Sequence, residues 1–415
     1  MSISAAVEVK GWCPGVLRPM QSGDGLIARV RPWCGAFGLT QAEGLAAAAE
    51  RFGNGHIDLT RRANLQIRGL GHTGLSGLQG VLERLGLVDR DPQAEAARNI
   101  MIAPLAGIDP AELFDVRPVA RALENRLAVD ATLHGLPSKF GFLVDGGGTV
   151  SIAGERADIS LRAVGSAMAL GLDTGNGTEW LGSTSRDVAA EAALAAASAF
   201  IGISGGRGRL RNLGAEGLAL LRDVVRRMLD PVVSELPIVS RKSLGVLDLG
   251  AKRIAVGVAA PFGRLEADQL RRFVEMAGDA GVTDIRLSPW RVLYVEARDV
   301  AAAHRLAEAA HGISLVVDPD DPILRIEACP GAPSCRSSSV DTRRDARRFA
   351  ALAFEGTLHV SGCAKGCARS APADLVLVGV QGGRQGRYDV IRNGTTRDAA
   401  ERTIDAAEAG TLLDV

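Results

Sequence analysis

Four of the six cysteines lie in two short, glycine-containing segments late in the sequence. One reads Cys329-Pro-Gly-Ala-Pro-Ser-Cys335 and the other Cys363-Ala-Lys-Gly-Cys367, with 27 residues between them. Structural zinc sites favour closer cysteine pairs, and the ferredoxin run C-x2-C-x2-C is absent. Four thiolates on two loops can still hold a 4Fe-4S cluster, and small residues let backbone N–H groups approach its sulfides. The spacing favours a 4Fe-4S cluster, with zinc or incidental thiols as the alternatives.

The elements that must position these loops occur twice. Residues 57–67 read IDLTRRANLQI and residues 285–295 read IRLSPWRVLYV, and apolar residues alternate in both, as in strands with one buried face. Each stretch follows a helix-like segment, which in turn follows an apolar strand. The pattern predicts a β-α-β half-unit that is present in two copies.

A second pair of segments repeats in the same order. Gly146 and Gly362 each end an apolar strand, and an Ala-Asp-apolar sequence follows eleven residues after each. The matched positions are Gly147 with Cys363, Ser151 with Cys367, and residues 99–103 with 325–329. The order is therefore A-B-A′-B′, and only B′ carries the cysteines. Chance similarity among Ala-, Leu- and Val-rich segments is the alternative.

Composition excludes several functional classes. The 415 residues carry 48 basic and 48 acidic side chains, so net charge gives no general attraction to nucleic acid or to an anionic membrane. Aromatic residues make up only 4%, which disfavours base-stacking surfaces. Neither a signal peptide nor an apolar run of about 18 residues is visible. We expect a cytoplasmic protein without membrane or nucleic-acid partners, whose cysteines bind metal or stay free.

At these residues the chain resembles the sirohaem-dependent sulfite and nitrite reductase superfamily. The cysteine spacing, the duplicated order and three motifs carry the resemblance. The T-x-R-x-x-x-Q motif places Arg62 in the family's anion-binding position, Arg98-Asn99 precedes an apolar run, and L-P-x-K-F-K appears as LPSKFG with Lys139. The family's second lysine is Gly141 here. That departure removes one cation from the site that binds the oxyanion in the reductases.

The resemblance implies an α+β chain with a duplicated nitrite/sulfite-reductase-like fold and pseudo-twofold A-B-A′-B′ order. We expect four segments. They are a ferredoxin-like half-unit at 1–75, an α/β lobe without cluster at 76–238, a second ferredoxin-like half-unit at 239–315, and an α/β lobe with the cluster at 316–415.

Residues 11–26, GWCPGVLRPMQSGDGL, are similar to the opening of the precorrin-3B synthases, the oxygen-dependent branch of this superfamily. The segment CPGAPSC is typical of the same branch. This resemblance implies a monooxygenase of aerobic cobalamin biosynthesis that hydroxylates precorrin-3A at carbon C20, while a ring A acetate closes a γ-lactone. It also implies a 4Fe-4S cluster and a mononuclear non-haem iron that activates O2. A sirohaem-dependent sulfite or nitrite reductase and a non-catalytic Fe–S redox sensor are the alternatives.

Sirohaem and precorrin-3A are both tetrapyrroles rich in carboxylates, which arginine forks match bidentately. Within the motifs, Arg62, Arg98 and Lys139 are the catalytic candidates. The candidates for substrate binding are Arg18, Arg62, Arg68, Arg98, Lys139 and, more weakly, Arg369. For an arginine outside a motif, a solvated surface charge is the simpler explanation.

Electron supply and iron ligation are less visible in the sequence. The Gly-rich runs give neither strand–GxGxxG–helix nor a P-loop, so we expect an external donor, an NADH-linked reductase or a ferredoxin. His134 and His359 precede the motif and the cluster loop, but an ordinary hydrogen-bonded histidine is the better explanation for each. Lys365 is predicted to be a charge partner of the cluster or a docking point for the donor. Cys13 and Cys34 are expected to be inert buried thiols.

Overall fold

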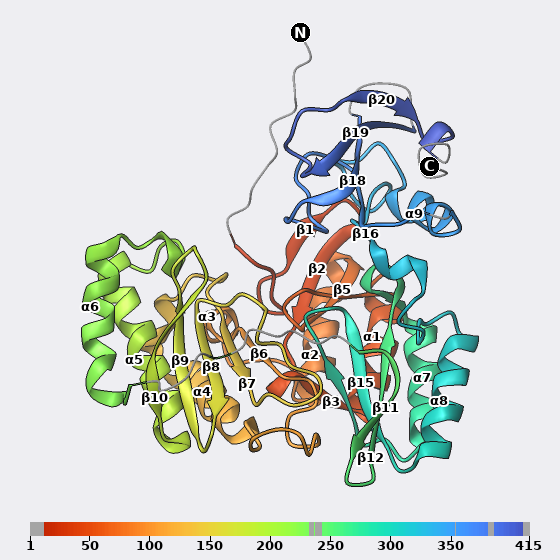
Figure 1. The fold of residues 1–415 in the computed structure, drawn as a ribbon. Coiled ribbons are helices and arrows are strands. Elements are labelled where there is room, and N and C mark those ends of the chain that lie inside the picture. The colour runs from red at the N-terminus through yellow and green to blue at the C-terminus, as the bar shows by residue number, and fades with distance from the viewer. Residues whose placement is uncertain (1–11, 232–235, 237–242, 353, 381–385, 410–415) are drawn as a thin grey trace. The chain divides into compact units, whose positions relative to one another are not determined.

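The computed structural model describes residues 12–231, 236, 243–352, 354–380 and 386–409, which form two compact units. The larger unit contains Trp12–Met20 and Ile27–Val317. The smaller contains Gln21–Leu26 and the described residues from Asp318 onward. Figure 1 labels the helices and strands.

The two predicted half-units have matching elements. The first contains β1 (Met20–Ser22), β2 (Gly25–Val30), β3 (Ala36–Gly38), α1 (Leu39–Phe52), β4 (His56–Leu59), β5 (Leu65–Leu70) and α2 (Leu75–Arg84). The second contains β11 (Gly245–Gly250), β12 (Arg253–Ala259), β13 (Arg264–Glu266), α7 (Ala267–Asp279), β14 (Asp284–Leu287), β15 (Val292–Ala297) and α8 (Val300–Gly312). The sheet orders are β1-β2-β5-β4-β13 and β11-β12-β15-β14-β3. Each half-unit therefore gives one short edge strand to the sheet of the other.

The repeat extends to single hydrogen bonds. Gln41 accepts a bond from the Gly38 N–H at 2.9 Å and donates to the Leu85 carbonyl at 2.7 Å. Gln269 accepts from the Glu266 N–H at 3.0 Å and donates to the Ile313 carbonyl at 2.8 Å. Each glutamine thus satisfies one free donor at the start of its helix, α1 or α7. These two helices also pack against each other.

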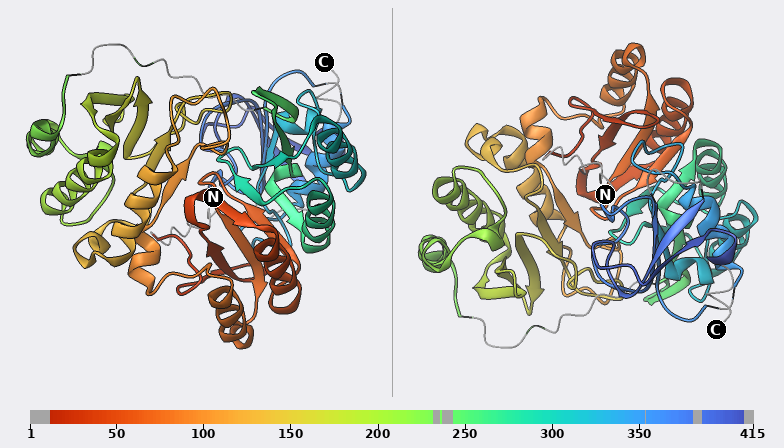
Figure 2. Two further views of the ribbon diagram at one scale, coloured as in Figure 1. Left: turned by 90° about the horizontal axis from the view of Figure 1, so that it is seen from below. Right: turned by 90° about the horizontal axis from the view of Figure 1, so that it is seen from above.

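The first α/β lobe has the sheet order β10-β9-β8-β7-β6, with β6, β7 and β8 parallel and the other strands antiparallel. Its strands are β6 (Ile100–Ile102), β7 (Phe142–Asp145), β8 (Ile159–Val164), β9 (Ala167–Asp173) and β10 (Thr178–Thr184). Its helices are α3 (Pro92–Ala97), α4 (Arg117–Val129), α5 (Arg186–Ser204) and α6 (Ala215–Val225). α5 and α6 lie side by side in all three views of Figures 1 and 2.

The second lobe repeats this sheet in the smaller unit, in the order β16-β17-β18-β19-β20. Its strands are β16 (Ile326–Ala328), β17 (Leu358–Ser361), β18 (Ala373–Gly379), β19 (Arg387–Gly394) and β20 (Arg402–Asp405), and its helix is α9 (Thr342–Ala350). Phe142 pairs with Ile159 in the first lobe, and Leu358 pairs with Leu375 in the second. Both pairs obey the sequence register that matches Gly146 with Gly362. The predicted duplicated α+β fold is confirmed, whereas the four segment boundaries stay predictions.

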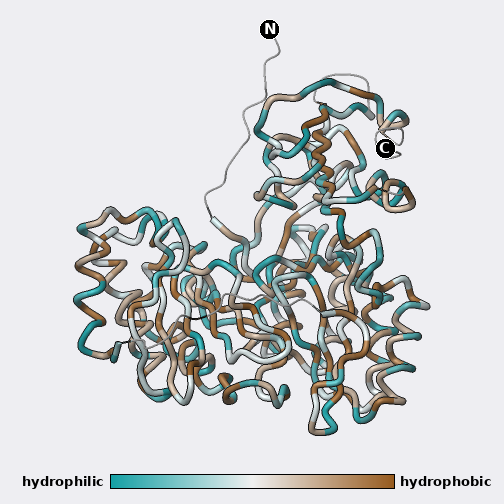
Figure 3. Tube along the Cα trace, viewed as in Figure 1, coloured by the Kyte–Doolittle hydropathy of each residue, from teal (hydrophilic) through white to brown (hydrophobic). Residues whose placement is uncertain are grey.

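α5 is the one helix among the described residues that is long and apolar enough to cross a membrane. Eight of its residues, mostly alanine, are buried in the core of the first lobe, where the helix contacts β8 and β9. Its apolar character is thus explained by packing on the sheet. Brown segments in Figure 3 likewise mark the hydrophobic stretches of the chain, many of them on strands.

Candidate functional site

The four clustered cysteines lie at one edge of the second lobe. Cys329 follows β16, and Cys363 follows β17 after Gly362. Because β16 and β17 are parallel neighbours, their carboxyl ends meet at the same sheet edge. The Gly362 N–H donates to the Cys329 Sγ at 3.2 Å, which joins the two loops directly. Cys329 is buried, Cys335 and Cys363 are half-buried, and Cys367 is exposed.

The four thiols influence one another electrostatically. Burial, followed by the neighbouring Cys329, Cys363 and Cys335, raises the pKa of Cys367 to about 11 against the opposing charge of Lys365. Burial also raises the pKa of Cys363, again with Cys335 and Cys329 nearby. Cys363 and Cys367 therefore hold their protons at neutral pH when no metal is bound, and binding a metal cluster must release them. The influence of Lys365 supports its predicted role as a charge partner.

Small residues let the backbone around the cysteines pack closely. A Cβ atom at Gly362 would lie 2.2 Å from the Ser338 Oγ, and Gly366 has a φ of +61°. Gly23, in the N-terminal motif, packs so closely that a Cβ there would lie 2.9 Å from the Cα of Cys335. These glycines, together with the N–H bond to sulfur, fit a cluster held by thiolates.

The described residues contain no group of three or more His, Cys, Asp or Glu close enough to hold a single metal ion. The four cysteines do not form such a single-ion group either. A four-iron cube holds its thiolates farther apart than a single metal ion does. His134 is an ordinary hydrogen-bonded residue, whose Nε2–H donates to the Leu127 carbonyl oxygen at 3.1 Å. His359 is buried within β17. The mononuclear iron has no ligand set here and stays a prediction.

Arg369, at the end of the cluster loop, is engaged by the protein. Its Nη1 lies 3.0 Å from Glu327, and its Nε and Nη2 donate to the Pro372 carbonyl at 2.9 and 2.7 Å. These contacts tie the loop to β16 and β18, so we infer a structural role.

A second group of residues surrounds Arg62 in the larger unit. Thr60 shapes the turn that carries Arg62, since its hydroxyl accepts bonds from the Arg62 and Asn64 N–H groups, each at 3.2 Å. Burial lowers the pKa of Arg62, and Arg209 and Arg29 lower it further. Several cations thus share one partly buried region, which would attract an anion.

Cys13 belongs to this arginine group, whose charges act on its thiol. Burial raises the pKa of Cys13, but Arg29, Arg62 and Arg31 lower it by more, so it lies below the ordinary thiol value. The Cys13 N–H also donates to the Ser138 Oγ at 3.1 Å, next to Lys139. Cys34 has the opposite environment, because burial and the neighbouring Glu124 raise its pKa to about 12.

Gly141 gives Arg62 its space. A Cβ atom at Gly141 would lie 3.1 Å from the Arg62 Nη1 and 3.0 Å from the Asn99 Nδ2. Any side chain at this position would press on both groups. Gly141, which stands at the place of the second lysine in the family motif, thus leaves the Arg62 guanidinium room.

Arg98 has a different environment from the predicted one. It is only 2% exposed and forms a bidentate pair with Asp89, with both distances 2.8 Å. It also bonds to Glu124 at 3.3 Å and stacks on the Trp33 ring at 4.2 Å. Because protein groups engage its guanidinium, Arg98 fits a structural role better than direct binding of substrate.

The remaining predicted cations differ in accessibility. Arg68 is buried and lies 3.4 Å from Asp58, which also pairs with Arg264 at 2.9 Å. Arg18 is exposed and stacks on Trp12 at 4.5 Å. Lys139 is exposed and has no ion-pair partner among the described residues. Arg62, Lys139 and Arg18 are therefore the predicted cations that a substrate can reach.

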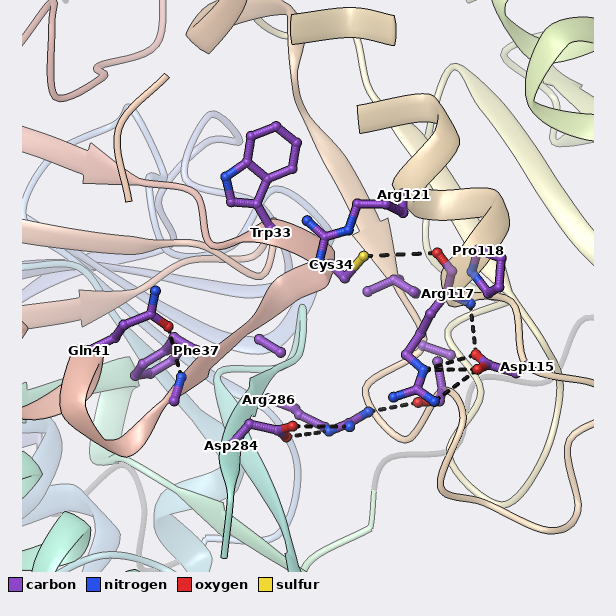
Figure 4. A pocket seen from close by; sticks show the side chains of 15 residues that line it. Trp33, Cys34, Phe37, Gln41, Asp115, Arg117, Pro118, Arg121, Asp284 and Arg286 are labelled. Carbon is purple, nitrogen blue, oxygen red and sulfur yellow. Dashed lines mark hydrogen bonds and ion pairs between the residues drawn. The ribbon is translucent and has the colours of Figure 1, made fainter. Parts of the chain in front are cut away.

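A cavity of about 440 Å³ opens elsewhere in the larger unit, between β3, α4 and β14 (Figure 4). Arg117 pairs with Asp115 at 2.8 Å, and Arg286 pairs with Asp284 at 2.7 Å. The third arginine that lines this cavity, Arg121, lies 3.7 Å from Glu124. These charges are largely compensated, so the cavity is a poor match for a substrate with many carboxylates.

Sequence reasoning missed Arg29 and Arg209. Arg209 forms a bidentate pair with Asp158, at 2.9 and 2.8 Å. Asp158 also accepts the Gly141 N–H at 2.9 Å, which connects the Gly-rich run around Arg209 to the LPSKFG motif. The repeated Ala-Asp-apolar sequence could have led to Arg209, because it marked its partner Asp158 as a matched position of the repeat.

Comparisons with known proteins agree with this architecture. The family model of the nitrite/sulfite reductase ferredoxin-like half domain matches residues 18–82 and 249–309, and that of the nitrite and sulphite reductase 4Fe-4S domain matches 93–230. The second match falls on the lobe without cysteines, as expected if both lobes derive from one ancestor. The structure also resembles Mycobacterium tuberculosis NirA, with a TM-score of 0.73 and 21% identity over 94% of this chain and 79% of that chain.

Two curated relatives cover most of the chain. A ferredoxin–nitrite reductase of Synechococcus elongatus is 26% identical over 91% of this chain and 80% of its own length. A precorrin-3B synthase of Sinorhizobium sp is 33% identical over 97% of this chain and 87% of its own length. The chain belongs to the precorrin-3B synthase family, an oxidoreductase family with the nitrite and sulfite reductase fold.

Proposed function

We propose that the chain is an oxygen-dependent monooxygenase that converts precorrin-3A to precorrin-3B in cobalamin biosynthesis, by hydroxylation at C20 with closure of a γ-lactone. The observation that carries this proposal is the site around Gly141. Gly141 stands where the family motif has a second lysine, and a side chain there would press on Arg62 and Asn99. The chain keeps cations for a carboxylate-rich ligand but lacks one of those that the reductases use on their oxyanion.

In this proposal Arg62, Lys139 and Arg18 bind substrate carboxylates. Arg62 is the central residue, because the turn at Thr60 fixes its backbone and because Arg29 adds positive charge beside it, whereas Asp158 largely compensates the charge of Arg209. Lys139 and Arg18 are exposed and adjust to the outer carboxylates. Arg98 and Arg68 stabilise the framework behind them.

We assign the 4Fe-4S cluster to Cys329, Cys335, Cys363 and Cys367. Such a cluster supplies single electrons for the activation of O2. The chain's own residues hold the thiols together, through the Gly362 N–H on the Cys329 Sγ and the Thr342 hydroxyl on the Cys329 carbonyl at 2.6 Å. Electrons come from an external donor, a ferredoxin or an NADH-linked reductase, and we place the reaction in the cytoplasm.

The test starts with protein purified without oxygen and analysed for iron, sulfide and absorption. Broad Fe–S absorption near 400 nm without sirohaem bands is expected. Incubation with precorrin-3A, O2 and a reductant should then give a product heavier by one oxygen atom, and 18O2 should label it. A cluster-containing protein that leaves precorrin-3A unchanged would contradict the proposal.

A sirohaem-dependent nitrite or sulfite reductase is the second candidate, favoured by the 26% identity to a ferredoxin–nitrite reductase. Strong sirohaem bands in the same spectrum, with reduction of nitrite or sulfite, would replace the first proposal with this one.

A further inference from the structure

Two buried polar residues lie behind the cysteine loops, in the core of the second lobe. Asp345 on α9 is 1% exposed and Tyr388 on β19 is fully buried. The Tyr388 hydroxyl donates to the Asp345 Oδ2 at 2.7 Å. The other carboxylate oxygen, Oδ1, has no hydrogen-bond donor among the described residues, and the Arg344 Nε lies 3.6 Å from it.

The fold itself does not require this pair. In the cysteine-free lobe, the register that matches Ala103 with Cys329 places Val119 opposite Asp345. The register that matches Gly146 with Gly362 also matches Ala163 with Gly379. Met168 pairs with Ala163 across the sheet, and Tyr388 pairs with Gly379, so Met168 is the counterpart of Tyr388. Val119 and Met168 are both buried in an apolar core. The same sheet and helix therefore pack with aliphatic residues when no cysteines are present.

Burial of a carboxylate opposes folding unless its surroundings compensate it. One hydrogen bond and one distant cation are modest compensation. A feature that is costly and confined to the cysteine-bearing lobe points to a role connected with the cysteines.

The pair is linked to a cluster ligand through α9. Thr342, one helical turn before Asp345, donates to the Cys329 carbonyl at 2.6 Å, and its Oγ1 lies 3.8 Å from the Cys329 Sγ. Burial raises the pKa of Tyr388, as do its bond to Asp345 and the charges of Asp345 and Cys329. Tyr388 therefore remains a hydrogen-bond donor, and Cys329 is close enough to act on it.

We propose that Asp345, whose carboxylate is oriented by the Tyr388 hydroxyl, lowers the reduction potential of the 4Fe-4S cluster through its negative charge. The inference rests on the proposed assignment of the four cysteines. Reduction of the cluster takes one electron from the external donor, and no bond forms or breaks. The added negative charge is opposed by the buried carboxylate, whose field water screens little.

The experiment measures the midpoint potential of the cluster in the full, cluster-loaded chain by redox titration with EPR detection. Asp345→Asn should increase the equilibrium constant for reduction about tenfold or more, and tenfold equals about 59 mV for one electron. Tyr388→Phe should give a smaller shift to lower potential, because the hydroxyl dipole no longer offsets the carboxylate charge. Asp374→Asn is the control, since this exposed carboxylate is screened by water and should leave the potential unchanged.

A double variant, Asp345→Val with Tyr388→Met, copies the apolar pair of the cysteine-free lobe. It removes the carboxylate without leaving an unpaired polar group in the core, which a single variant can do. It should also raise the potential. Wild-type potentials in Asp345→Asn or in the double variant, at full iron and sulfide content, would overturn the inference. If neither variant assembles a cluster, an unchanged potential in Tyr388→Phe overturns it. A wild-type chain without iron and sulfide would instead refute the cysteine assignment.

Discussion

The two α/β lobes share one sheet topology but connect equivalent loops in different ways. In the cysteine-bearing lobe, thiols approach each other across the loops after β16 and β17. In the cysteine-free lobe, the same two loops are joined by Asp109, which accepts bonds from the Thr149 N–H and hydroxyl. Ser151, at the position of Cys367, donates to the buried Asp145 at 2.7 Å.

This comparison separates what the fold needs from what the chemistry needs. Hydrogen bonds alone close the loops of the first lobe, so the cysteines of the second are not required for closure. The first lobe instead contributes Gly141, Asn99 and Arg209 to the surroundings of Arg62. One lobe is thus equipped for redox chemistry and the other for binding anions, as proposed above.

The largest expected effect comes from the cysteine-bearing lobe. Cys363→Ser should lose the cluster and the activity together, because a serine hydroxyl is a poor ligand for iron at neutral pH. Iron and sulfide analysis with EPR checks this result. Cys34→Ser is the control and should keep the full cluster, since Cys34 bonds to Glu124 far from the cysteine loops in sequence. An active, cluster-containing Cys363→Ser protein would break the ligand assignment.

The matched aspartates Asp158 and Asp374 give the next contrast. Asp158 is fully buried and holds Arg209, the Gly141 N–H and the Leu210 N–H. Asp374 is exposed and bonds only to Thr357 in the described contacts. Asp158→Asn should destabilise the larger unit by about 3 kcal/mol, because it leaves a partly buried arginine without its counter-charge.

Thermal unfolding followed by circular dichroism measures this difference. Asp374→Asn should leave the melting temperature nearly unchanged, because water replaces its bonds. Equal losses in the two variants would show that the buried pair does not distinguish the lobes.

The sequence alone predicted the duplication correctly, down to single residues. A strand whose apolar residues alternate cannot slip by one residue without exposing its apolar face. The match of Leu59 and Leu65 with Leu287 and Leu293 was therefore strongly constrained. In the structure Leu59 pairs with Leu65, and Leu287 pairs with Leu293. The exchange of β3 and β13 between half-units was not predictable. Each strand has three residues, too few to show a period.

The cation site was harder to predict because it depends on tertiary pairing. Arg98 stands in a family motif, but Asp89 and Glu124 reach it only after folding and bury its charge. Arg29 and Arg209 lie outside every motif in an arginine-rich chain, so nothing in their local sequence distinguished them. For the cysteine loops, the sequence correctly indicated only that two loops meet, as they do after β16 and β17, and the ligand assignment stays a prediction.

A variant of Arg62 tests whether the binding function belongs to the larger unit. Arg62→Ala should raise the KM for precorrin-3A about tenfold to a hundredfold, the usual effect of losing a charge-assisted bond. The cluster absorption should not change. Arg121→Ala, in the cavity of Figure 4, is a control and should leave the KM near that of the wild type. An altered cluster spectrum in Arg62→Ala would make Arg62 structural.

The acidic loop of the cysteine-free lobe predicts a pH effect on stability. Burial, followed by the neighbouring Asp115, Asp109 and Asp145, raises the pKa of Glu112 to about 8. The folded state therefore keeps a proton that the unfolded state releases near pH 4.5, so stability falls as pH rises from about 4.5 to about 8. Glu112→Gln removes this titration and should stabilise the protein by about 1–3 kcal/mol at pH 8.5 but not at pH 4. Melting temperatures across this range measure it, and a constant difference would contradict the shifted pKa.

The smallest effect concerns the reactivity of Cys13 and Cys34, which are both half-buried in the larger unit. Arginines lower the pKa of Cys13, whereas burial and Glu124 raise that of Cys34 to about 12. Since the thiolate is the reactive form, iodoacetamide at about pH 7.5 should modify Cys13 at least about tenfold faster than Cys34. Peptide mass spectrometry over time measures both rates in one sample. Arg62→Ala should slow Cys13 and leave Cys34 unchanged, because only Cys13 depends on that charge. If Cys13 and Cys34 of the wild type were modified at equal rates, the arginines around Cys13 would create no field that attracts anions. The proposed division of roles between the lobes would then lose its electrostatic support.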